Sequence, residues 1–210
     1  MTLRSILAAL AAVAMLGAAP QAMAGNIAQT MAVFTDNPLA PKVTPRSYDV
    51  TIVEYFDYAC PYCKRMEPVL EQLVASDHKV RIVYRDWPVI RPESRIAARL
   101  AIASQYQGKH AAFHDALFNV PGRLNDQSIR AAAKTAGVDW KRLEADEKAH
   151  AADIDKLLAE TDFHAQKLGL QGTPALLVGN HLLRGAVDLP TLKRVVAAVR
   201  AEEAGGNAPA

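Results

Sequence analysis

The stretch that decides the fold runs from Val50 to Lys64 and reads VTIVEYFDYACPYCK. Residues 50–56 are mostly β-branched or aromatic, which is typical of a buried strand. Cys60 stands where a helix is expected to begin, and Pro61 fits the first helical position because a missing N–H costs nothing there. The helix is expected to run through residue 74, with a kink at Pro68. The stretch therefore predicts a strand that leads directly into a helix, with two cysteines at the junction.

The segments that follow predict one domain with an insertion. Residues 79–85 alternate as a second strand, so strand, helix and strand form a right-handed parallel βαβ unit. Strand signal then almost disappears, and the sequence predicts helices at 93–107, 109–119, 126–136, 139–148 and 151–168, with Asp126 and Asp139 as N-caps. Strands return at 175–178 and 181–184 around a Gly-Asn turn, and a closing helix capped by Asp188 follows. Two consecutive domains are excluded because the flanking pieces are too small to bury separate cores.

The two ends of the chain are expected to lie outside the folded domain. Arg4 is the only charge in residues 1–24, an apolar run follows it, and Ala22-Met23-Ala24 supplies a small-residue cleavage site. This pattern indicates a signal peptide cleaved after Ala24, and the alternative is an uncleaved anchor. Residues 25–47 are read as an extended lead-in with a short helix around 27–34. The tail at 204–210 is expected to be disordered.

Composition excludes some classes of partner. The chain has 210 residues, half of them apolar, and a formal net charge of only +2. This small charge, without a Lys/Arg run, gives no reason to expect nucleic acid or a membrane surface as a partner.

The cysteines point to redox chemistry. The chain contains two, Cys60 and Cys63, separated by two residues. A disulfide that closes so short a loop contributes little stability, although a structural clip stays an alternative. Half of a metal site is a second alternative, but zinc needs about four ligands and no second Cys pair is present. At a helix N-terminus, free N–H groups stabilise a Cys60 thiolate, and Cys63 lies one turn further to resolve a mixed disulfide.

The stretch Val53–Lys64 resembles the active-site strand and helix of the DsbA-like thioredoxin-fold family. Gly172-Thr173-Pro174-Ala175 resembles that fold's cis-proline loop, Asp86-Trp87-Pro88-Val89 resembles its members as well, and the helical insertion is the family's arrangement. The resemblance implies a thioredoxin-like domain formed by 48–90 and 169–203, interrupted by a helical insertion at 91–168.

Carried onto this sequence, the resemblance implies roles for seven residues. Cys60 is the attacking thiol and Cys63 the resolving thiol, while Pro61 and Tyr62 tune the redox potential. Pro174, in a cis peptide after Thr173, would lie beside the disulfide and help to hold an extended substrate. Glu54 matches the acid buried beneath the active site, where it could relay the proton of Cys63. The alternatives are a strand-entry proline at Pro174 and a structural glutamate at Glu54.

Other candidate residues are histidines and tyrosines. His110 and His114 have a helical spacing that can hold a metal, but no third ligand is evident, so we interpret them as surface residues. Tyr62 is expected to be exposed beside the thiol as an apolar surface for unfolded substrates, together with Tyr58.

The sequence thus predicts a periplasmic thiol-disulfide oxidoreductase that exchanges disulfides with exported polypeptides and favours oxidation. Disulfide isomerase or reductase activity is the first alternative, and a non-catalytic chaperone or peptide-binding module is the second. A membrane redox partner would reoxidise the protein, and no metal or organic cofactor is implied. A monomer is expected because few residues precede the first strand and they contain no heptads.

Overall fold

The computed structural model describes residues 31–206, so the predicted signal peptide and the first half of the expected helix at 27–34 lie outside the described residues. Residues 31–35 are helical. The elements that follow are β1 (Lys42–Val43), β2 (Val50–Phe56), α2 (Pro61–Ser76), β3 (Val80–Asp86), α3 (Pro92–Ala103), η1 (Ser104–Gln107), α4 (His110–Phe118), α5 (Asp126–Thr135), α6 (Trp140–Ala149), α7 (Ala151–Lys167), β4 (Ala175–Val178), β5 (His181–Arg184) and α8 (Leu189–Gly206).

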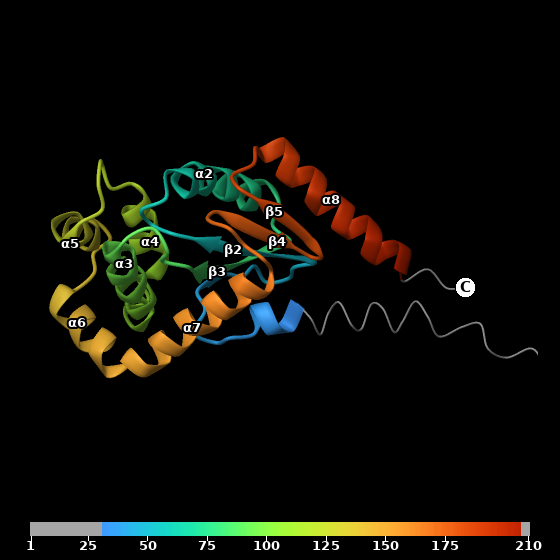
Figure 1. Cartoon of the computed structure of the whole chain (residues 1–210). Helices are drawn as coiled ribbons and strands as arrows, with labels where there is room; N and C mark the ends of the chain where they lie inside the picture. Colours follow the sequence, from blue (N-terminus) through green and yellow to red (C-terminus); the bar gives the residue numbers. More distant parts are fainter. Residues whose placement is uncertain (1–30, 207–210) are drawn as a thin grey trace, which may run out of the picture.

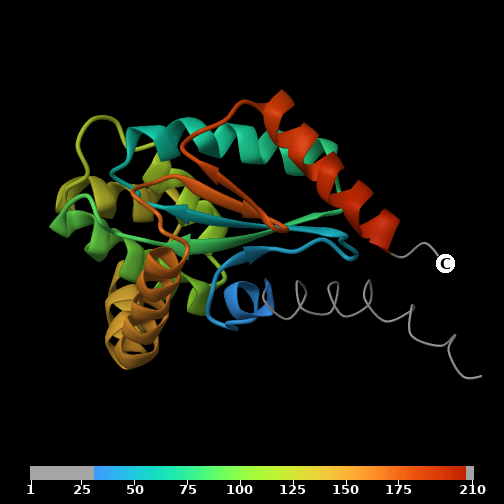
Figure 2. The ribbon, with the colours of Figure 1, turned by 45° about the vertical axis from the view of Figure 1, so that its right-hand side comes forward.

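The five strands form one sheet in the order β1-β3-β2-β4-β5. Strands β2 and β3 are parallel, which confirms the predicted βαβ unit, whereas β1, β4 and β5 each pair antiparallel with a neighbour. Helices α2 and α8 cover one face of the sheet, and α7 lies on the other with the helical residues 31–35 (Figures 1 and 2). The arrangement is the thioredoxin-like α/β fold, with helices α3 to α7 inserted between β3 and β4.

The central strand β2 forms the middle of the core because six of its seven residues are buried. Helix α2 places Met66, Leu70 and Leu73 over the sheet at the spacing of one helical face, and it continues through Pro68. Burial of each such side chain stabilises the fold by about 1.5–3 kcal/mol relative to an exposed position. The core therefore fixes the direction of α2 and the position of its first turn.

Polar contacts attach the inserted helices to the sheet. Arg85 at the end of β3 is completely buried, and its guanidinium donates to the Glu160 carboxylate of α7 at 2.7 Å and to the Phe34 carbonyl at 3.0 Å. The indole of Trp87 donates to Asp162 on the same helix at 3.0 Å. A buried charge of this kind is tolerated only when it is paired, so Glu160 is needed where Arg85 is buried.

The structure differs from the predictions in three local features. Strand β1, which pairs with β3, was expected only as extended chain, and the N-cap of α5 is Asn125 rather than Asp126. Asp139 and Asp188 do accept hydrogen bonds at the predicted helix starts, at 3.0 and 2.9 Å. Helix α8 continues to Gly206, so residues 204–206 are helical where we expected disorder.

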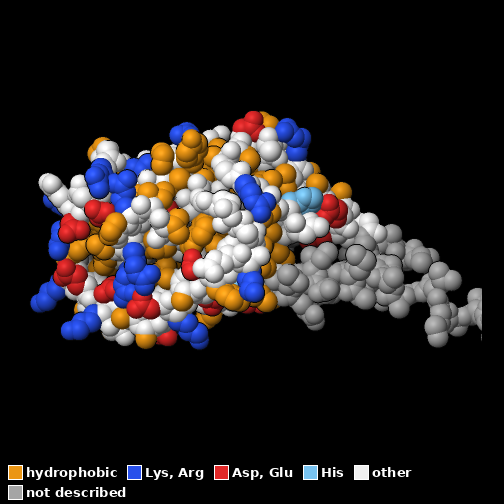
Figure 3. Space-filling view, viewed as in Figure 1, with side chains coloured by type: hydrophobic (Ala, Val, Ile, Leu, Met, Phe, Trp, Pro, Cys, Tyr) orange, Lys and Arg blue, Asp and Glu red, His pale blue; other side chains and the backbone are white. Residues whose placement is uncertain are grey.

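Hydrophobic and charged side chains are distributed unevenly over the surface. Hydrophobic side chains gather in the middle of the face shown in Figure 3, whereas charged side chains are frequent over α5 and α6 at the left. Among the described helices, none combines the length and the apolar character that crossing a bilayer requires.

Candidate active site

The first turn of α2 carries both cysteines as free thiols. Cys60 is the N-cap, with an extended backbone conformation (φ −79°, ψ 119°), and Pro61 takes the first helical position as predicted. The carbonyl of Cys60 accepts the N–H of Lys64 at 3.1 Å, so the intrahelical hydrogen bonds begin at the nucleophile itself. The sulfur of Cys60 therefore lies among the N–H groups that a helix leaves unpaired at its start.

The loop before β4 completes the environment of Cys60. The peptide bond between Thr173 and Pro174 is cis, and the thiol of Cys60 donates to the Thr173 carbonyl at 3.3 Å. Residues 60 and 173 are far apart in the sequence. The pairing of β2 with β4 brings them together because Tyr55 lies opposite Ala175.

The two thiols have opposite acid-base character. The hydrogen bond from the Cys63 thiol lowers the pKa of Cys60, and against the opposing effect of burial, the N–H groups of Cys63 and Tyr62 help to bring it to about 5. Burial raises the pKa of Cys63, and both its hydrogen bond to Cys60 and the negative charge of Glu54 raise it further. Cys60 is therefore a thiolate at neutral pH while Cys63 keeps its proton.

Glu54 lies beneath the cysteines in the central strand. It is completely buried, and within residues 31–206 neither carboxyl oxygen has a hydrogen-bond partner. Burial raises the pKa of Glu54 well above its ordinary value, and the charges of Glu67, Asp86 and Cys60 add to the effect. A carboxyl group whose pKa is raised keeps its proton to a higher pH and can exchange it with a neighbouring sulfur.

A buried hydrogen-bonded network extends from the active-site loop to α4. The Tyr58 hydroxyl lies 2.8 Å from Nδ1 of His114, and Nε2 of His114 lies 3.2 Å from the Glu67 carboxylate on α2. His114 is 1% exposed and Tyr58 is 1% exposed. The interpretation of His114 as a surface residue, and of Tyr58 as an exposed one, was therefore wrong. Both side chains satisfy polar atoms inside the core, which an apolar contact could not do.

His110 is partly buried rather than a surface residue. Burial lowers its pKa well below the ordinary value, with a further contribution from His114. Its ring is tilted by 38° relative to the ring of Tyr84, and the two ring centres lie 6.0 Å apart. The two histidines line a hollow of about 430 Å³ between α2, β3 and α4.

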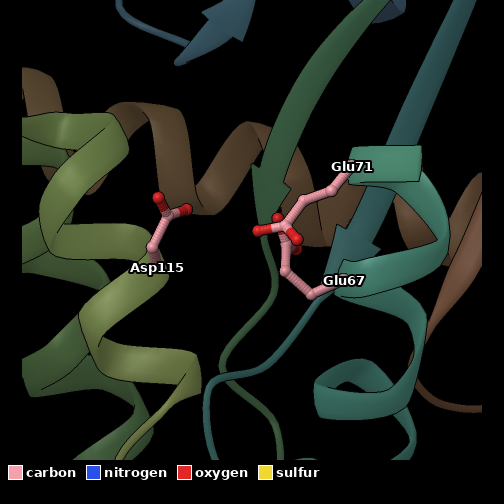
Figure 4. Close-up of side chains that lie close together, drawn as sticks. All are labelled: Glu67, Glu71 and Asp115. Atoms are coloured by element: carbon pink, nitrogen blue, oxygen red, sulfur yellow. The ribbon is translucent and has the colours of Figure 1, made fainter. Parts of the chain in front are cut away.

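Three carboxylates line this hollow. Glu67 and Glu71 project from α2 toward Asp115 of α4, and oxygen atoms of all three lie within 4.8 Å of one another (Figure 4). Burial raises the pKa of Glu71 and of Asp115, and the nearby charge of Glu67 contributes to both shifts. Oxygen ligands of this kind suit hard divalent cations, but acidic groups of this kind are common without an ion, and we assign none.

The surroundings of Cys60 include exposed apolar side chains. Tyr62 is 55% exposed as predicted, and the Arg65 guanidinium lies 4.3 Å from the centre of its ring. Val89 and Ile90 are also exposed, and their N–H groups donate to the Asp57 carboxylate at 2.9 Å each. Asp57 thus holds the loop after β3 against the loop that precedes Cys60.

Sequence reasoning missed Glu67, assigned His114 to the surface, and named Asp86 only as part of a stretch that resembles the family. Glu67 follows Cys63 by one turn on the buried face of α2, and His114 shares the buried face of α4 with Phe113 and Leu117. The helical period therefore contained a signal for both. Burial raises the pKa of Asp86 to about 7, although His114 opposes the shift.

Comparison with known proteins shows which family and which solved structures the chain is similar to. Residues 51–197 match the DSBA-like thioredoxin domain. A solved thioredoxin-like oxidoreductase from Silicibacter pomeroyi is 38% identical (TM-score 0.78), covering 81% of this chain and 97% of that one. The thiol-disulfide exchange protein alpha-DsbA2 from Wolbachia pipientis is 27% identical (TM-score 0.76), covering 88% and 100%. A periplasmic thioredoxin-like protein from Salmonella enterica serovar Typhimurium is 29% identical (TM-score 0.70), covering 82% and 97%.

The curated relatives are longer proteins. One, described as a Na⁺/H⁺ antiporter NhaA from Salinispora arenicola, is 30% identical over 156 residues, which are 72% of this chain but 23% of the relative. The chain thus spans about a quarter of the length of the curated relatives it matches. The family match covers more than half of the chain, and the solved structures share its fold over 81–88% of its length. This chain therefore belongs to the DsbA-like thioredoxin family.

Proposed function

We propose that this protein is a periplasmic thiol-disulfide oxidoreductase that transfers its Cys60–Cys63 disulfide to cysteines of exported polypeptides. The observation that carries the proposal is the position of Cys60 at the helix N-cap, 3.3 Å from the Thr173 carbonyl, with Cys63 one turn behind it. A stabilised Cys60 thiolate favours the reduced form, so the disulfide is a strong oxidant. Oxidation of substrates is therefore the favoured direction.

Two exchange steps account for the reaction. A substrate thiolate attacks Sγ of Cys60, the Cys60–Cys63 bond breaks, and Cys63 leaves with the electron pair and takes up a proton. A second substrate thiolate attacks the substrate sulfur of the mixed disulfide, and Cys60 leaves as a thiolate. The substrate dithiol loses two electrons and the protein disulfide gains them.

Cys60 suits the role of attacked and leaving sulfur because its low pKa makes it the better leaving group. Cys63, which is completely buried, suits the role of resolving thiol because it stays protonated until a base accepts its proton. Glu54 is the group we propose for that proton transfer, since its charge and that of Cys63 interact directly. Pro61 and Tyr62 adjust the balance by setting the geometry of the first turn.

The location and partners of the protein follow from the same proposal. The signal peptide expected at residues 1–24 directs the chain to the periplasm, where a solved relative of the same fold is found. Reduced Cys60 and Cys63 must be reoxidised there, and a membrane redox partner would accept the electrons. We propose that the protein works as a monomer.

The test is a pair of assays with one substrate in two states. Wild-type protein should oxidise reduced, unfolded ribonuclease faster than it recovers activity from ribonuclease with scrambled disulfides. The reverse order of rates would favour isomerase activity, and reduction of insulin without oxidation would favour a reductase. Cys60→Ser should lose every one of these activities. Insulin reduction by the wild type but not by Cys60→Ser would exclude a non-catalytic chaperone or peptide-binding module, whereas a wild type without any of these activities would favour one.

A further inference from the structure

A hollow of about 270 Å³ opens directly beside the active-site turn, and we name it the basic hollow. Its wall includes Ala59, which precedes Cys60, and Lys64 from the second turn of α2. Arg91, at the N-cap of α3, and Arg123, in the segment between α4 and α5, complete the charged part of the wall. A group bound in this space would therefore lie beside Ala59, the residue before the cysteine that exchanges disulfides.

All charged side chains that line the basic hollow are positively charged. Three of its lining residues are cationic, and no Asp or Glu is among the described residues that line it. Within residues 31–205, none of Lys64, Arg91 and Arg123 forms an ion pair. Three unpaired cations around one concave space attract an anion, and the attraction is strongest where solvent is partly excluded.

The hydrogen bonds of these cations leave capacity for a ligand. The Lys64 ammonium donates to the Val120 carbonyl at 2.8 Å, which fixes the side chain across the hollow but uses only one of its three donors. Nε of Arg91 is buried and has no partner among the described residues. The nearby Asp57 carboxylate is already occupied by N–H groups of Ala59, Val89 and Ile90.

We propose, resting on the function proposed above, that the basic hollow binds a carboxylate adjacent to the reacting cysteine of the thiol partner. The main source would be an Asp or Glu side chain of a polypeptide substrate. An extended chain advances about 3.3–3.6 Å per residue, so an acidic residue about one to three positions from the substrate cysteine would reach a wall that includes Ala59, the residue before Cys60. The preference separates substrates by their local charge, whereas exposed apolar residues such as Tyr62 accept any unfolded chain.

The experiment compares dithiol peptides that differ in one residue. Glu or Gln is placed one, two or three positions from the reacting cysteine, and kcat/KM for oxidation is measured with wild type, Arg91→Gln and Arg123→Gln. Wild type should prefer the best Glu peptide by about five- to tenfold at low salt, since partly exposed ion pairs contribute modestly. The preference should fall toward one in both variants and should shrink as salt screens the charges.

Arg46→Gln is the matched control. The substitution removes the same charge, and Arg46 is exposed and lies outside the basic hollow. It should keep the full preference. Glutathione and its amidated form provide a second arm: a preference for the acidic form that Arg123→Gln removes would support the same site with a small thiol as its source. Equal rates for Glu and Gln at every position, or a preference that survives in Arg91→Gln and Arg123→Gln, would overturn the proposal.

Two further readouts separate this inference from the proposed function. The absolute rate with Gln peptides tests disulfide exchange alone and does not depend on the basic hollow. Titration of the protein with peptides in which Ser replaces each Cys tests the carboxylate site without turnover, by comparing dissociation constants for the Glu and Gln forms. Tighter binding of the Glu form to wild type but not to Arg123→Gln would support the site even if oxidation failed, and equal binding would contradict it.

Discussion

Cys60 and Cys63 lie three residues apart at the start of one helix, yet their surroundings lower the pKa of Cys60 and raise the pKa of Cys63. Their exposed fractions are both small, at 3% and 0%. Cys60 accepts hydrogen bonds from the Cys63 thiol and from helix N–H groups, whereas Cys63 lies above the acid Glu54. The comparison shows that accepted hydrogen bonds make Cys60 the nucleophile, whereas burial is the main cause that keeps the proton on Cys63.

The largest expected effect comes from exchanging the two positions for serine. Cys60→Ser should reduce oxidation to the background rate, because no other thiolate lies at the helix start. Cys63→Ser should still form a mixed disulfide through Cys60 but fail to release it by internal attack, so the trapped complex accumulates. Mass spectrometry of the trapped adducts checks the assignment, and adducts on Cys63 of Cys60→Ser would reverse the roles.

The buried network beneath the site should respond next most strongly. His114→Leu should lower the free energy of unfolding by about 2–4 kcal/mol, because Tyr58 and Glu67 each lose a buried partner. His110→Leu is the matched control, with a loss within about 1 kcal/mol, since Nε2 of His110 has no partner among the described residues. Urea denaturation measures both, and equal losses would contradict the network.

Replacement of the carboxyl group of Glu54 should raise the free energy of unfolding, whereas the change at His114 should lower it. Because the pKa of Glu54 is raised in the folded protein, its carboxylate costs stability as pH rises above the unfolded value near 4.5. Glu54→Gln should therefore match wild type at pH 4 and gain about 1–3 kcal/mol of unfolding free energy by pH 8. It should also slow the release of mixed disulfides if Glu54 carries the Cys63 proton.

Glu160→Gln is the control for that experiment because Glu160 pairs with the buried Arg85. Although partial burial opposes them, the hydrogen bonds from Arg85 and Asn37 lower the pKa of Glu160. Its stabilising effect is present above the unfolded pKa and is lost as pH falls through the folded pKa. Thermal unfolding across the pH range should give opposite slopes for the two variants, and parallel slopes would contradict the account of Glu54.

The smallest effect on stability is expected at the exposed surface. Tyr62→Ala should cost less than about 1 kcal/mol, since the ring is half exposed and stacks only with Arg65. Oxidation of apolar substrates should nevertheless slow a few-fold. Tyr48→Ala is the matched control, because Tyr48 is 43% exposed and stacks with Arg81 at 4.4 Å before β2, away from the cysteines. Equal activity of the two variants would remove Tyr62 from substrate binding.

Much of the fold could be predicted because its signals are local. The β-branched and aromatic run at 50–56 located β2, and the strand signals around the Gly-Asn turn located β4 and β5, each with its observed bounds. The inserted helices begin within about two residues of the predicted limits, an error normal for such reasoning, although the helix predicted at 93–107 divides into α3 and the 3-10 helix η1. Strand β1 escaped prediction because two residues carry no period. Helix α8 extended further than expected because Ala and Glu at 201–204 favour helix more than their polarity suggests.

Some residues of the site could be predicted from the sequence and others could not, for the same reason. The nucleophile could be predicted because the helix start and the cysteines are adjacent in sequence. The network of Tyr58, His114 and Glu67 could not, because its members come from a loop and two helices that only the folded chain brings together. The pair His110 and His114 shows the limit clearly, since the same residue type at helical spacing gives a bonded core group and a group without a partner among the described residues.

The measurement that tests the central claim most directly is the ultraviolet absorbance of the thiolate as reduced protein is titrated with base. Wild type should show a single thiolate transition near pH 5, absent from Cys60→Ser. Cys63→Ala should keep the transition at a higher pH, because the hydrogen bond from Cys63 is the largest contribution that lowers the pKa of Cys60. A wild-type transition near pH 9, or one that persists in Cys60→Ser, would contradict the account.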